Sequence, residues 1–378
     1  MALTPAHVED AHALIEPHIH RTPLLTSTTL STLASTPQDP SSPLSGLTEQ
    51  DTPAKPKIRL FFKCENLQRV GAFKARGAFH AVRRLIDEMG IEEVRRRGVV
   101  THSSGNHAQA LALAASTFQI PAHIVMPSIS TPSKIAATQG YGARVVFSGP
   151  TSTEREAVVA QVQQETGAFL IPPYDHADII LGQGTVALEM DEQYIELVSS
   201  RPELSVHGGD SAKVMGGLDA VITPIGGGGL NAGVATYFSD KETKVFGAEP
   251  SFEGADDCRR GLEAGSRIES VKTTTIADGL RTPVGVLNWA VISDRSKVNG
   301  VYSVTEEQIK AAMRLVLERM KLVVEPSAVV GLAVVLYNEE FRRMVEAEAG
   351  EDGWDIGVVF SGGNTTVEAI GKLLGSSS

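Results

Sequence analysis

The sequence predicts an α/β fold with two domains of twisted, mostly parallel sheets flanked by helices. Three observations predict it. Short β-branched runs alternate with helical patterns along most of the chain, which is typical of parallel strands joined through helices. Several of these runs lead directly into glycine or serine, and a length of 378 residues exceeds one ordinary core. Ligands of such sheets bind at the carboxyl ends of the strands, so those ends are the expected location of the chemistry.

The expected strands are runs of four to eight residues rich in Val, Ile and Phe. They cover residues 58–65, 98–103, 122–127, 143–149, 168–173, 219–226, 244–250 and 356–363. Helical patterns lie between most of them, for example at 106–119 and 153–167. Two stretches rich in Pro, Ser and other small or polar residues, 34–57 and 199–217, interrupt the alternation. We expect both to be surface insertions, the first one mobile, because they contain too little apolar surface to pack.

Composition excludes several classes of function. The formal net charge is −11, which disfavours a nucleic-acid partner because phosphate binding needs a basic surface. No apolar run reaches about 18 residues, so no membrane span is expected. The two cysteines, Cys64 and Cys258, form neither a metal motif nor a disulfide framework. These features predict a soluble enzyme of the cytoplasm, with an organelle matrix as the alternative.

A run of four glycines follows the expected strand at 219–226. It occurs in "ITPIGGGGLNAG", residues 222–233, and a helical pattern follows it. Glycine allows backbone N–H groups to approach an anion closely, and a helix N-terminus adds positive partial charge. The run therefore predicts a phosphate cradle. It is neither a P-loop nor a dinucleotide fingerprint, because no Gly-Lys-Ser/Thr and no GxGxxG follow.

A second polar loop joins a strand to a helix in "THSSGNHAQALA", residues 101–112. Ser, Asn and Gly at this junction would cap the helix and direct N–H groups into a cleft. Capping needs only one of these residues, so the group of two serines, an asparagine and a histidine indicates a carboxylate-binding loop. For His107, a structural role is an equally good interpretation.

Lys74 lies in "RVGAFKARGA", residues 69–78, between Phe73 and Ala75 and close to Gly71 and Gly77. The plain interpretation is a solvated lysine on a helix. The small neighbours instead favour a closely packed pocket, in which a desolvated amine loses its proton more readily and attacks carbonyl groups. The motif "FSGGN", residues 360–364, is a further candidate at a strand end, and Ser361 there would cap the backbone or contact a ligand.

These motifs occur together, and in the same order, in one family. The motifs are "NLQRVGAFKARGA", "SSGNHAQALA", "GQGTVALE", "PIGGGGLNAG", "IADGL", "EPSAVVGLA" and "SGGN". The chain resembles the pyridoxal-phosphate enzymes of the tryptophan-synthase-β fold, specifically the branch of serine/threonine dehydratases and serine racemases. The resemblance covers roughly residues 5–375 apart from the two insertions. It implies a large domain from residues 1–86 and 177–378 and a small domain from 96–175, and it implies a homodimer.

The resemblance assigns the cofactor-binding residues. Lys74 matches the lysine that binds pyridoxal phosphate covalently, and small neighbours would leave room for the cofactor ring. Asn106 matches the asparagine that contacts the phenolic oxygen, and Ser361 the residue that faces the pyridine nitrogen. A hydroxyl at that nitrogen suits α-proton removal with loss of a β-group better than transamination. The remaining matches are Phe73 beside the ring and the phosphate cup of Gly226, Gly227, Gly228, Gly229 and the amide of Leu230.

The resemblance also assigns substrate contacts. Ser103, Asn106 and His107 would hold the amino-acid carboxylate, and Lys74 would remove the Cα proton. Ser104 matches a serine that handles the proton on the opposite face in racemases, although it is also a plausible helix cap. Arg155 and Thr282 match residues near the substrate. Tyr174 stands where mammalian racemases have asparagine and many microbial dehydratases have an aromatic residue, which weakens the racemase interpretation.

The predicted activity is therefore elimination of water from a β-hydroxy amino acid such as L-serine or L-threonine, giving a 2-keto acid and ammonia. Serine racemase with eliminase side activity and threo-3-hydroxyaspartate ammonia-lyase are the alternatives. "GAEPSFEGADDC" resembles the divalent-cation site of this branch, with Glu249, the Ala255 carbonyl and Asp257 as ligands. Oxygen ligands suit Mg²⁺ or Ca²⁺. The segment is two residues longer than the mammalian pattern, so the ligand set is an expectation.

Overall fold

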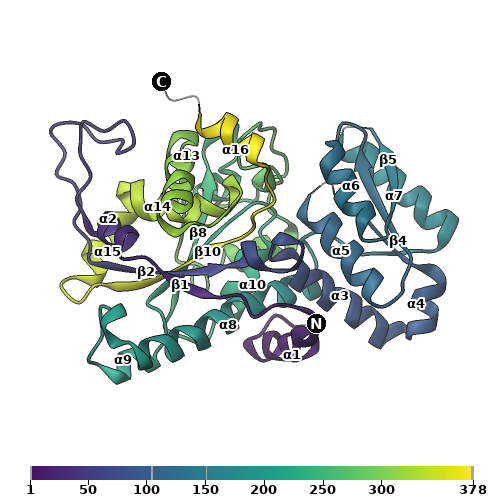
Figure 1. Ribbon diagram of the computed structural model, residues 1–378, viewed down its shortest axis with the longest axis horizontal. Helices are drawn as coiled ribbons and strands as arrows, with labels where there is room; N and C mark the ends of the chain where they lie inside the picture. Colours follow the sequence, from purple (N-terminus) through teal and green to yellow (C-terminus); the bar gives the residue numbers. More distant parts are fainter. Residues whose placement is uncertain (1, 104, 150, 376–378) are drawn as a thin grey trace.

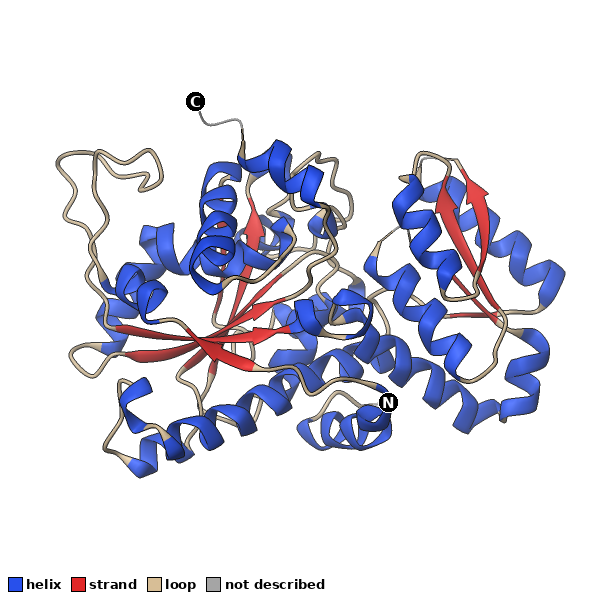
Figure 2. Cartoon of the chain, viewed as in Figure 1, coloured by secondary structure: helices blue, strands red, loops and turns tan. Residues whose placement is uncertain are grey.

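The computed structural model describes residues 2–103, 105–149 and 151–375. It consists of two α/β units that lie side by side (Figure 1). The larger contains a six-stranded sheet and the smaller a four-stranded sheet, each flanked by helices (Figure 2). No helix in the described ranges combines the length and apolarity that a bilayer crossing requires.

The large sheet has the strand order β1-β2-β10-β7-β8-β9. All neighbours in it are parallel except β1 and β2. The strands are β1 (Leu24–Thr26), β2 (Ile58–Cys64), β7 (Ala220–Pro224), β8 (Lys244–Pro250), β9 (Gly300–Val304) and β10 (Trp354–Phe360).

The small sheet has the order β5-β4-β3-β6 and is parallel throughout. Its strands are β3 (Val99–His102), β4 (Ala122–Pro127), β5 (Arg144–Ser148) and β6 (Phe169–Leu170). All of them come from one continuous stretch of the chain, whereas the large sheet draws on both ends of it. The domain bounds expected above stay a prediction.

Helices cover both sheets. In the N-terminal half they are α1 (Pro5–Ile15), α2 (Thr28–Ser35), α3 (Lys74–Met89), α4 (Ile91–Arg97), α5 (Asn106–Thr117), α6 (Pro132–Gly140), α7 (Ser152–Thr166) and α8 (Ala177–Ser200). In the C-terminal half they are α9 (Ser211–Met215), α10 (Gly229–Tyr237), α11 (Asp257–Ala264), α12 (Val286–Ile292), α13 (Glu306–Leu315), α14 (Val330–Tyr337), α15 (Glu339–Ala349) and α16 (Val367–Leu374). Short 3₁₀ turns used below are η2 (Glu65–Leu67), η3 (Arg69–Gly71), η6 (Asp278–Leu280) and η8 (Pro326–Val329).

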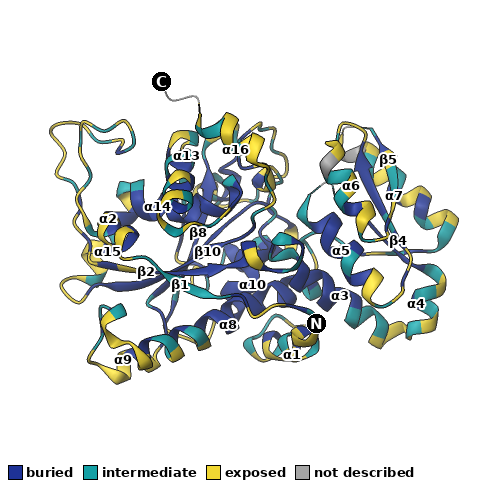
Figure 3. Cartoon of the chain, in the orientation of Figure 1, coloured by how far each residue is buried: buried dark blue, intermediate teal, exposed yellow. Residues whose placement is uncertain are grey.

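The inner strands of the large sheet are mostly apolar and buried because helices cover both of their faces. In β2 only Arg59 is exposed, and every residue of β10 is buried. Separate apolar clusters fill the two sides of the large sheet, and a third lies between α3, α5 and the small sheet. Figure 3 shows these buried layers at the centre of each half, with exposed residues on the outer helices.

The expected strands are largely present, with differences that have physical causes. The strand expected at 168–173 is limited to Phe169–Leu170, because Pro172 and Pro173 lack the N–H that a ladder needs. Two strands were not expected, β1 and β9. Both lie at the edges of the large sheet, where a weaker apolar pattern is sufficient.

The two insertions contain more contacts and regular structure than their composition predicts. The guanidinium of Arg342 is buried and donates to the carbonyl oxygens of Ala34 (2.6 Å), Thr36 (2.7 Å) and Ala54 (3.2 Å). It thereby joins the two ends of the 34–57 loop. The second insertion contains the short helix α9, so residues 199–217 are not simply a loop.

Candidate active site

Lys74 is the first residue of α3 and lies next to the carboxyl end of β10. Ala72 pairs with Gly362 in an isolated bridge, and the Phe73 N–H donates to the Ser361 carbonyl oxygen at 3.1 Å. The Lys74 ammonium donates to the carbonyl oxygen of Pro173 at 2.7 Å and lies 5.2 Å from the centre of the Phe73 ring. Burial of the amine lowers the pKa of Lys74 to about 8.

The two glycines near Lys74 lie closely against other parts of the chain. A Cβ on Gly77 would overlap Gln183 Nε2, and one on Gly182 would lie 2.7 Å from the Gly77 Cα. Gly77 is therefore small because α3 and α8 pack backbone to backbone. A Cβ on Gly71 would meet Asn364 Oδ1 at 2.8 Å. Close packing therefore accounts for Gly71 and Gly77, and space for a ring beside the amine stays a prediction.

The glycine loop connects β7 to α10 at the same edge of the large sheet. Gly228 has φ of +90°, a conformation that favours glycine. A Cβ on Gly227 would overlap Tyr174 Cγ, so no side chain fits there. Among the described residues, no protein acceptor contacts the N–H groups of Gly226, Gly227 or Gly228. Free amides beside the N-terminus of α10 form a site that suits a phosphate.

The asparagine loop faces this site from the small sheet. Gly105 is the N-cap of α5, and no described side chain caps that helix; the Ser103 hydroxyl accepts from the Gly105 N–H at 3.3 Å. The Asn106 amide bridges to the other half of the molecule. Its Nδ2 donates to Glu325 Oε1 at 2.9 Å, and its Oδ1 accepts from Asn364 Nδ2 at 2.8 Å. Ser104 lies outside the described residues.

His107 is buried at the start of α5, with Nε2 3.4 Å from the Ile171 carbonyl oxygen. Burial, and then the charge of Lys74, lower the pKa of His107 to about 3, so the ring is neutral. Its Nδ1 has no hydrogen-bond partner among the described residues. The contact with Ile171 supports a structural role, and the free Nδ1 leaves the predicted substrate contact open.

Two further predicted residues, Thr282 and Arg155, lie on segments that neighbour these loops. Thr282 is half-buried and belongs to the segment before α12. In that segment the Gly285 N–H donates to the Gly227 carbonyl oxygen at 3.1 Å, so the segment lies against the glycine loop. Arg155 lies on α7. Burial of His102 lowers the pKa of that ring, and the charge of Arg155 lowers it further. Ser361 is buried directly after β10, and Leu230 is buried in the first turn of α10.

The residues present fit pyridoxal phosphate. A desolvated amine, unpaired backbone amides at a helix N-terminus and a neutral hydroxyl at a strand end are the groups that an aldehyde, a phosphate and a pyridine nitrogen require. Lys74, the glycine loop, Asn106 and Ser361 all come from segments that follow a strand or begin a helix at this edge.

The predicted cation site lies at the end of β8. Both oxygens of Glu249 accept backbone N–H groups of α11, from Cys258 at 3.0 Å and Arg259 at 2.9 Å. Burial and the nearby Asp257 hold the pKa of Glu249 well above its usual range, and burial raises the pKa of Asp257 to about 6. Ala255, which lies between Glu249 and Asp257 in the sequence, is also buried. Two buried carboxylates that repel each other are a donor set that a hard divalent cation would stabilise.

Sequence reasoning named Tyr174 without its contact to the glycine loop, and it assigned no role to Asp175 or Glu325. Tyr174 packs its ring against Gly227, and Asp175 accepts from the N–H groups of Val286 and Leu287 at 2.8 Å each, which fixes the start of α12. Glu325 is the first residue of the motif "EPSAVVGLA". An acid directly before a buried apolar run was the available signal, because a carboxylate in such a place is seldom without a function.

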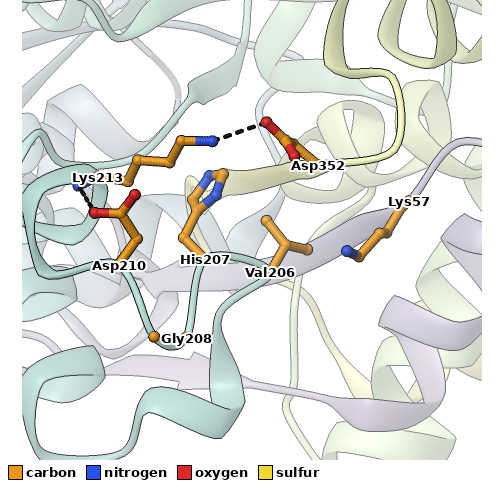
Figure 4. A pocket seen from close by; sticks show the side chains of 8 residues that line it. Lys57, Val206, His207, Gly208, Asp210, Lys213 and Asp352 are labelled. Atoms are coloured by element: carbon orange, nitrogen blue, oxygen red, sulfur yellow. Dashed lines mark hydrogen bonds and ion pairs between the residues drawn. The ribbon is translucent and has the colours of Figure 1, made fainter.

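A cavity of about 310 Å³ lies at the opposite, amino-terminal edge of the large sheet. Figure 4 shows its charged lining, with Lys213 reaching Asp352 and Asp210 turned toward the backbone of α9. Beneath it, His207 Nε2 lies 2.8 Å from Asp219 Oδ2, and Asp355 accepts from Tyr194, Ser205 and Val206. These groups already satisfy one another, and they hold the 199–217 insertion against the sheet.

Comparisons with known proteins agree with this geometry. The profile described as "PALP: Pyridoxal-phosphate dependent enzyme" matches residues 15–362. A serine racemase of Arabidopsis thaliana is 40% identical over 96% of this chain and 93% of its own length. The crystal structure of serine racemase from Dictyostelium discoideum superposes with a TM-score of 0.77 at 38% identity, covering 97% of this chain and all of that one. The crystal structure of T.th. threonine deaminase gives 0.74 at 35% identity, covering 96% and 99%.

Proposed function

Because this chain belongs to the pyridoxal-phosphate-dependent enzyme family, we propose that it interconverts the enantiomers of serine and, at the same site, eliminates water from β-hydroxy amino acids. The observation that carries the proposal is the buried amine of Lys74, between a glycine loop with free amides and the Asn106 loop. The sequence placed elimination first. The relatives favour the reverse order, because serine racemases match nearly the full length at up to 40% identity.

Each residue has a defined task in this proposal. Bound pyridoxal phosphate supplies the electron sink that acidifies the Cα–H bond of the attached amino acid. The amides of Gly226–Gly229 and Leu230 hold the phosphate, and Asn106 and Ser361 fix the orientation of the ring. Ser103, Asn106 and His107 bind the substrate carboxylate, with Arg155 and Thr282 beside it. The neutral amine of Lys74 accepts the Cα proton on its own face.

Ser104 decides between the two outcomes in this proposal. Ser104 lies outside the described residues, and the resemblance to racemases assigns its hydroxyl to the face opposite Lys74. Exchange of the Cα proton on that face gives the other enantiomer. When the β-hydroxyl leaves instead, the products are a 2-keto acid and ammonia. We expect Ser104→Ala to abolish racemisation while it retains elimination.

Ammonia-lyase as the main activity is the second candidate. The likeness to the T.th. threonine deaminase and the position of the Tyr174 ring on the glycine loop favour it. A side-chain carboxylate on the substrate, as in threo-3-hydroxyaspartate, would find a cation in Arg155.

The deciding assay incubates the purified protein with L-serine, D-serine, L-threonine and both 3-hydroxyaspartate diastereomers, and follows enantiomer and keto acid together. Formation of D-serine from L-serine at a rate comparable to pyruvate formation is expected. Keto acid alone would establish the lyase interpretation. Borohydride reduction followed by peptide mapping should label Lys74, and Lys74→Ala should carry no label and no activity; a label on another residue contradicts the site.

Further properties belong to the same proposal. We place a Mg²⁺ or Ca²⁺ ion at Glu249, the Ala255 carbonyl and Asp257. We expect a homodimer in the cytoplasm, with small amino acids as ligands and neither nucleic acid nor membrane as a partner. The acidic charge and the two buried, unpaired cysteines support this setting.

A further inference from the structure

Asn288 lies in the first turn of α12, and its side-chain amide contacts the glycine loop. The residue is fully buried. Its Nδ2 donates to the Gly227 carbonyl oxygen at 2.5 Å and, more weakly, to the Tyr174 carbonyl oxygen at 3.4 Å. The N–H of Gly285, the N-cap of α12, donates to the same Gly227 carbonyl oxygen at 3.1 Å. Two donors at the start of one helix therefore hold the Gly227 carbonyl group.

The start of α12 is itself anchored by Asp175. The carboxylate of Asp175 accepts from the N–H groups of Val286 and Leu287 at 2.8 Å each, and from that of Asn288 at 3.4 Å. A Cβ on Gly285 would overlap Asp175 Cγ, so the contact leaves no room for a side chain between them. A carboxylate at this position satisfies N–H groups that have no partner within the helix. Asn288 therefore meets the glycine loop from a fixed position.

The direction of the Gly227 carbonyl group determines the direction of one amide of the loop. The Gly227 C=O and the Gly228 N–H belong to the same peptide unit. The described peptide bonds are all trans, and the C=O and N–H of a trans unit point in opposite directions. Because the C=O points at Asn288, the Gly228 N–H points away from α12. It has no protein acceptor among the described residues, so it is free to donate to a ligand anion.

Packing alone does not account for an asparagine at position 288. A Cβ on Gly228 would lie 3.0 Å from both Asn288 Cβ and Ile292 Cδ1, so the loop packs closely on this face of α12. The Oδ1 atom of Asn288 is buried and has no hydrogen-bond partner in the described part of the chain. A buried acceptor without a partner costs stability, and an apolar side chain of similar size would avoid that cost. The contact of Nδ2 with the Gly227 carbonyl oxygen explains why an amide is present.

We propose that Asn288 is a positioning residue, whose Nδ2 fixes the peptide between Gly227 and Gly228 so that the Gly228 N–H is directed at the phosphate of pyridoxal phosphate. This inference rests on the proposed function, in which the glycine loop holds the phosphate. It assigns Asn288 no contact with cofactor or substrate. Loss of the contact should therefore weaken the binding of a ligand that has the phosphate and spare one that lacks it.

The test compares Asn288→Val with Asn288→Thr, because the two side chains have nearly the same shape and only threonine can donate a hydrogen bond. The readouts are the dissociation constants of the apoprotein for pyridoxal phosphate and for pyridoxal, which lacks the phosphate. We expect Asn288→Val to weaken binding of pyridoxal phosphate about tenfold, since one oriented hydrogen bond is lost, and to leave binding of pyridoxal unchanged. Asn288→Thr should stay nearer to wild type.

Asn338→Ala is the control. Asn338 Nδ2 also donates to a backbone carbonyl oxygen, that of Ser303 at 3.0 Å, and the residue lies between α14 and α15. This variant loses a comparable hydrogen bond away from the glycine loop. We expect its two dissociation constants to keep the wild-type ratio.

The ratio of the two dissociation constants separates positioning from stability. A variant that is partly unfolded binds both ligands more weakly by the same factor, so its ratio stays at the wild-type value. A wild-type ratio in Asn288→Val, or an equally changed ratio in Asn288→Thr, overturns the proposal. If Asn288→Val does not fold, the smaller pair Asn288→Ala and Asn288→Ser takes its place, and the two variants are judged by the same ratio.

The wild-type protein distinguishes failure of this inference from failure of the proposed function. A wild-type apoprotein that binds neither ligand overturns the proposed function as well. One that binds pyridoxal phosphate no more tightly than pyridoxal contradicts the glycine loop as the phosphate site. A wild type that prefers pyridoxal phosphate, with the same preference in Asn288→Val, overturns the role of Asn288 alone.

Discussion

At the scale of single residues, Lys74 combines a strand-end anchor with a desolvated amine. The Phe73 N–H fixes the start of α3 to β10, and the Pro173 carbonyl oxygen holds the ammonium from the small-sheet side. Burial is the cause of the lowered pKa of Lys74, and no neighbouring cation in the described part of the chain contributes to it. A neutral amine is the nucleophile that attacks an aldehyde.

The pH dependence of cofactor attachment follows from this pKa. The reactive amine is the deprotonated form, so the rate of attachment to the apoprotein should rise with pH and level off above about pH 8. Stopped-flow absorbance between pH 6 and pH 10 measures it, with Nα-acetyl-lysine as the reference amine. A rate that still rises near pH 10, as for the reference, would contradict a desolvated Lys74.

Gly227 gives a second test at this scale. Gly227→Ala places a methyl group against the Tyr174 ring, so the loop must shift away from its amide geometry. We expect a loss of cofactor affinity of at least about tenfold, since several amide contacts depend on that geometry. Gly209→Ala is the control, because nothing lies within 4 Å of its Cβ. Equal affinities in a cofactor titration of the two variants would exclude the loop as the phosphate site.

At the scale of elements, the residues predicted to bind the cofactor and the substrate follow the carboxyl ends of parallel strands. The glycine loop follows β7, Ser361 follows β10, and Ser103 follows β3. At the end of β8, the N-terminus of α11 donates to Glu249, and Asp257 is the first residue of that helix. A cation there would link β8 to α11.

The cation is tested by its effect on unfolding. Adding Mg²⁺ or Ca²⁺ to chelator-treated protein should raise the melting temperature by several degrees, because it neutralises two buried carboxylates. Glu249→Gln should abolish the rise. Glu263→Gln, on the same helix with its side chain 62% exposed, should retain it. A melting temperature insensitive to cation in the wild type would count against the site.

At the scale of the whole molecule, a buried ion network joins elements that are far apart in sequence. Arg76 on α3 contacts Glu65 at 2.8 Å and Glu189 on α8 at 2.7 Å, and Lys63 on β2 contacts Glu189 at 2.7 Å. All four side chains are almost fully buried. The network fixes α3, and with it Lys74, relative to the large sheet.

Removing one acid should be costly. Glu189→Ala leaves two buried cations against one carboxylate, and we expect it to lower the free energy of unfolding by about 3–5 kcal/mol. Glu192→Ala, one turn further along α8 with its side chain 54% exposed, should change it by less than about 1 kcal/mol. Urea titration measures both. Similar midpoints for the two variants would show that the network does not carry this stability.

How far the sequence predicts this protein depends on whether a feature is local. The β-branched runs, the four glycines at the start of α10 and the lysine at the start of α3 are local patterns. The fold class could be predicted from them, whereas the cofactor was predicted from the resemblance of seven motifs, and the residues assigned to its site stay a prediction. Edge strands such as β1 and the helix inside the 199–217 insertion have weak local patterns, and they were missed.

Contacts between distant residues were decided only by the tertiary structure. Asn106 meets Glu325 across 219 positions of sequence, and Gly77 is small because Gln183 lies against it. Strand and helix propensities act over a few residues, so the sequence by itself determined the elements and the residues at their ends. Which of those residues face one another depends on how α3, α5 and α8 pack between the two sheets, and no local pattern encodes that packing.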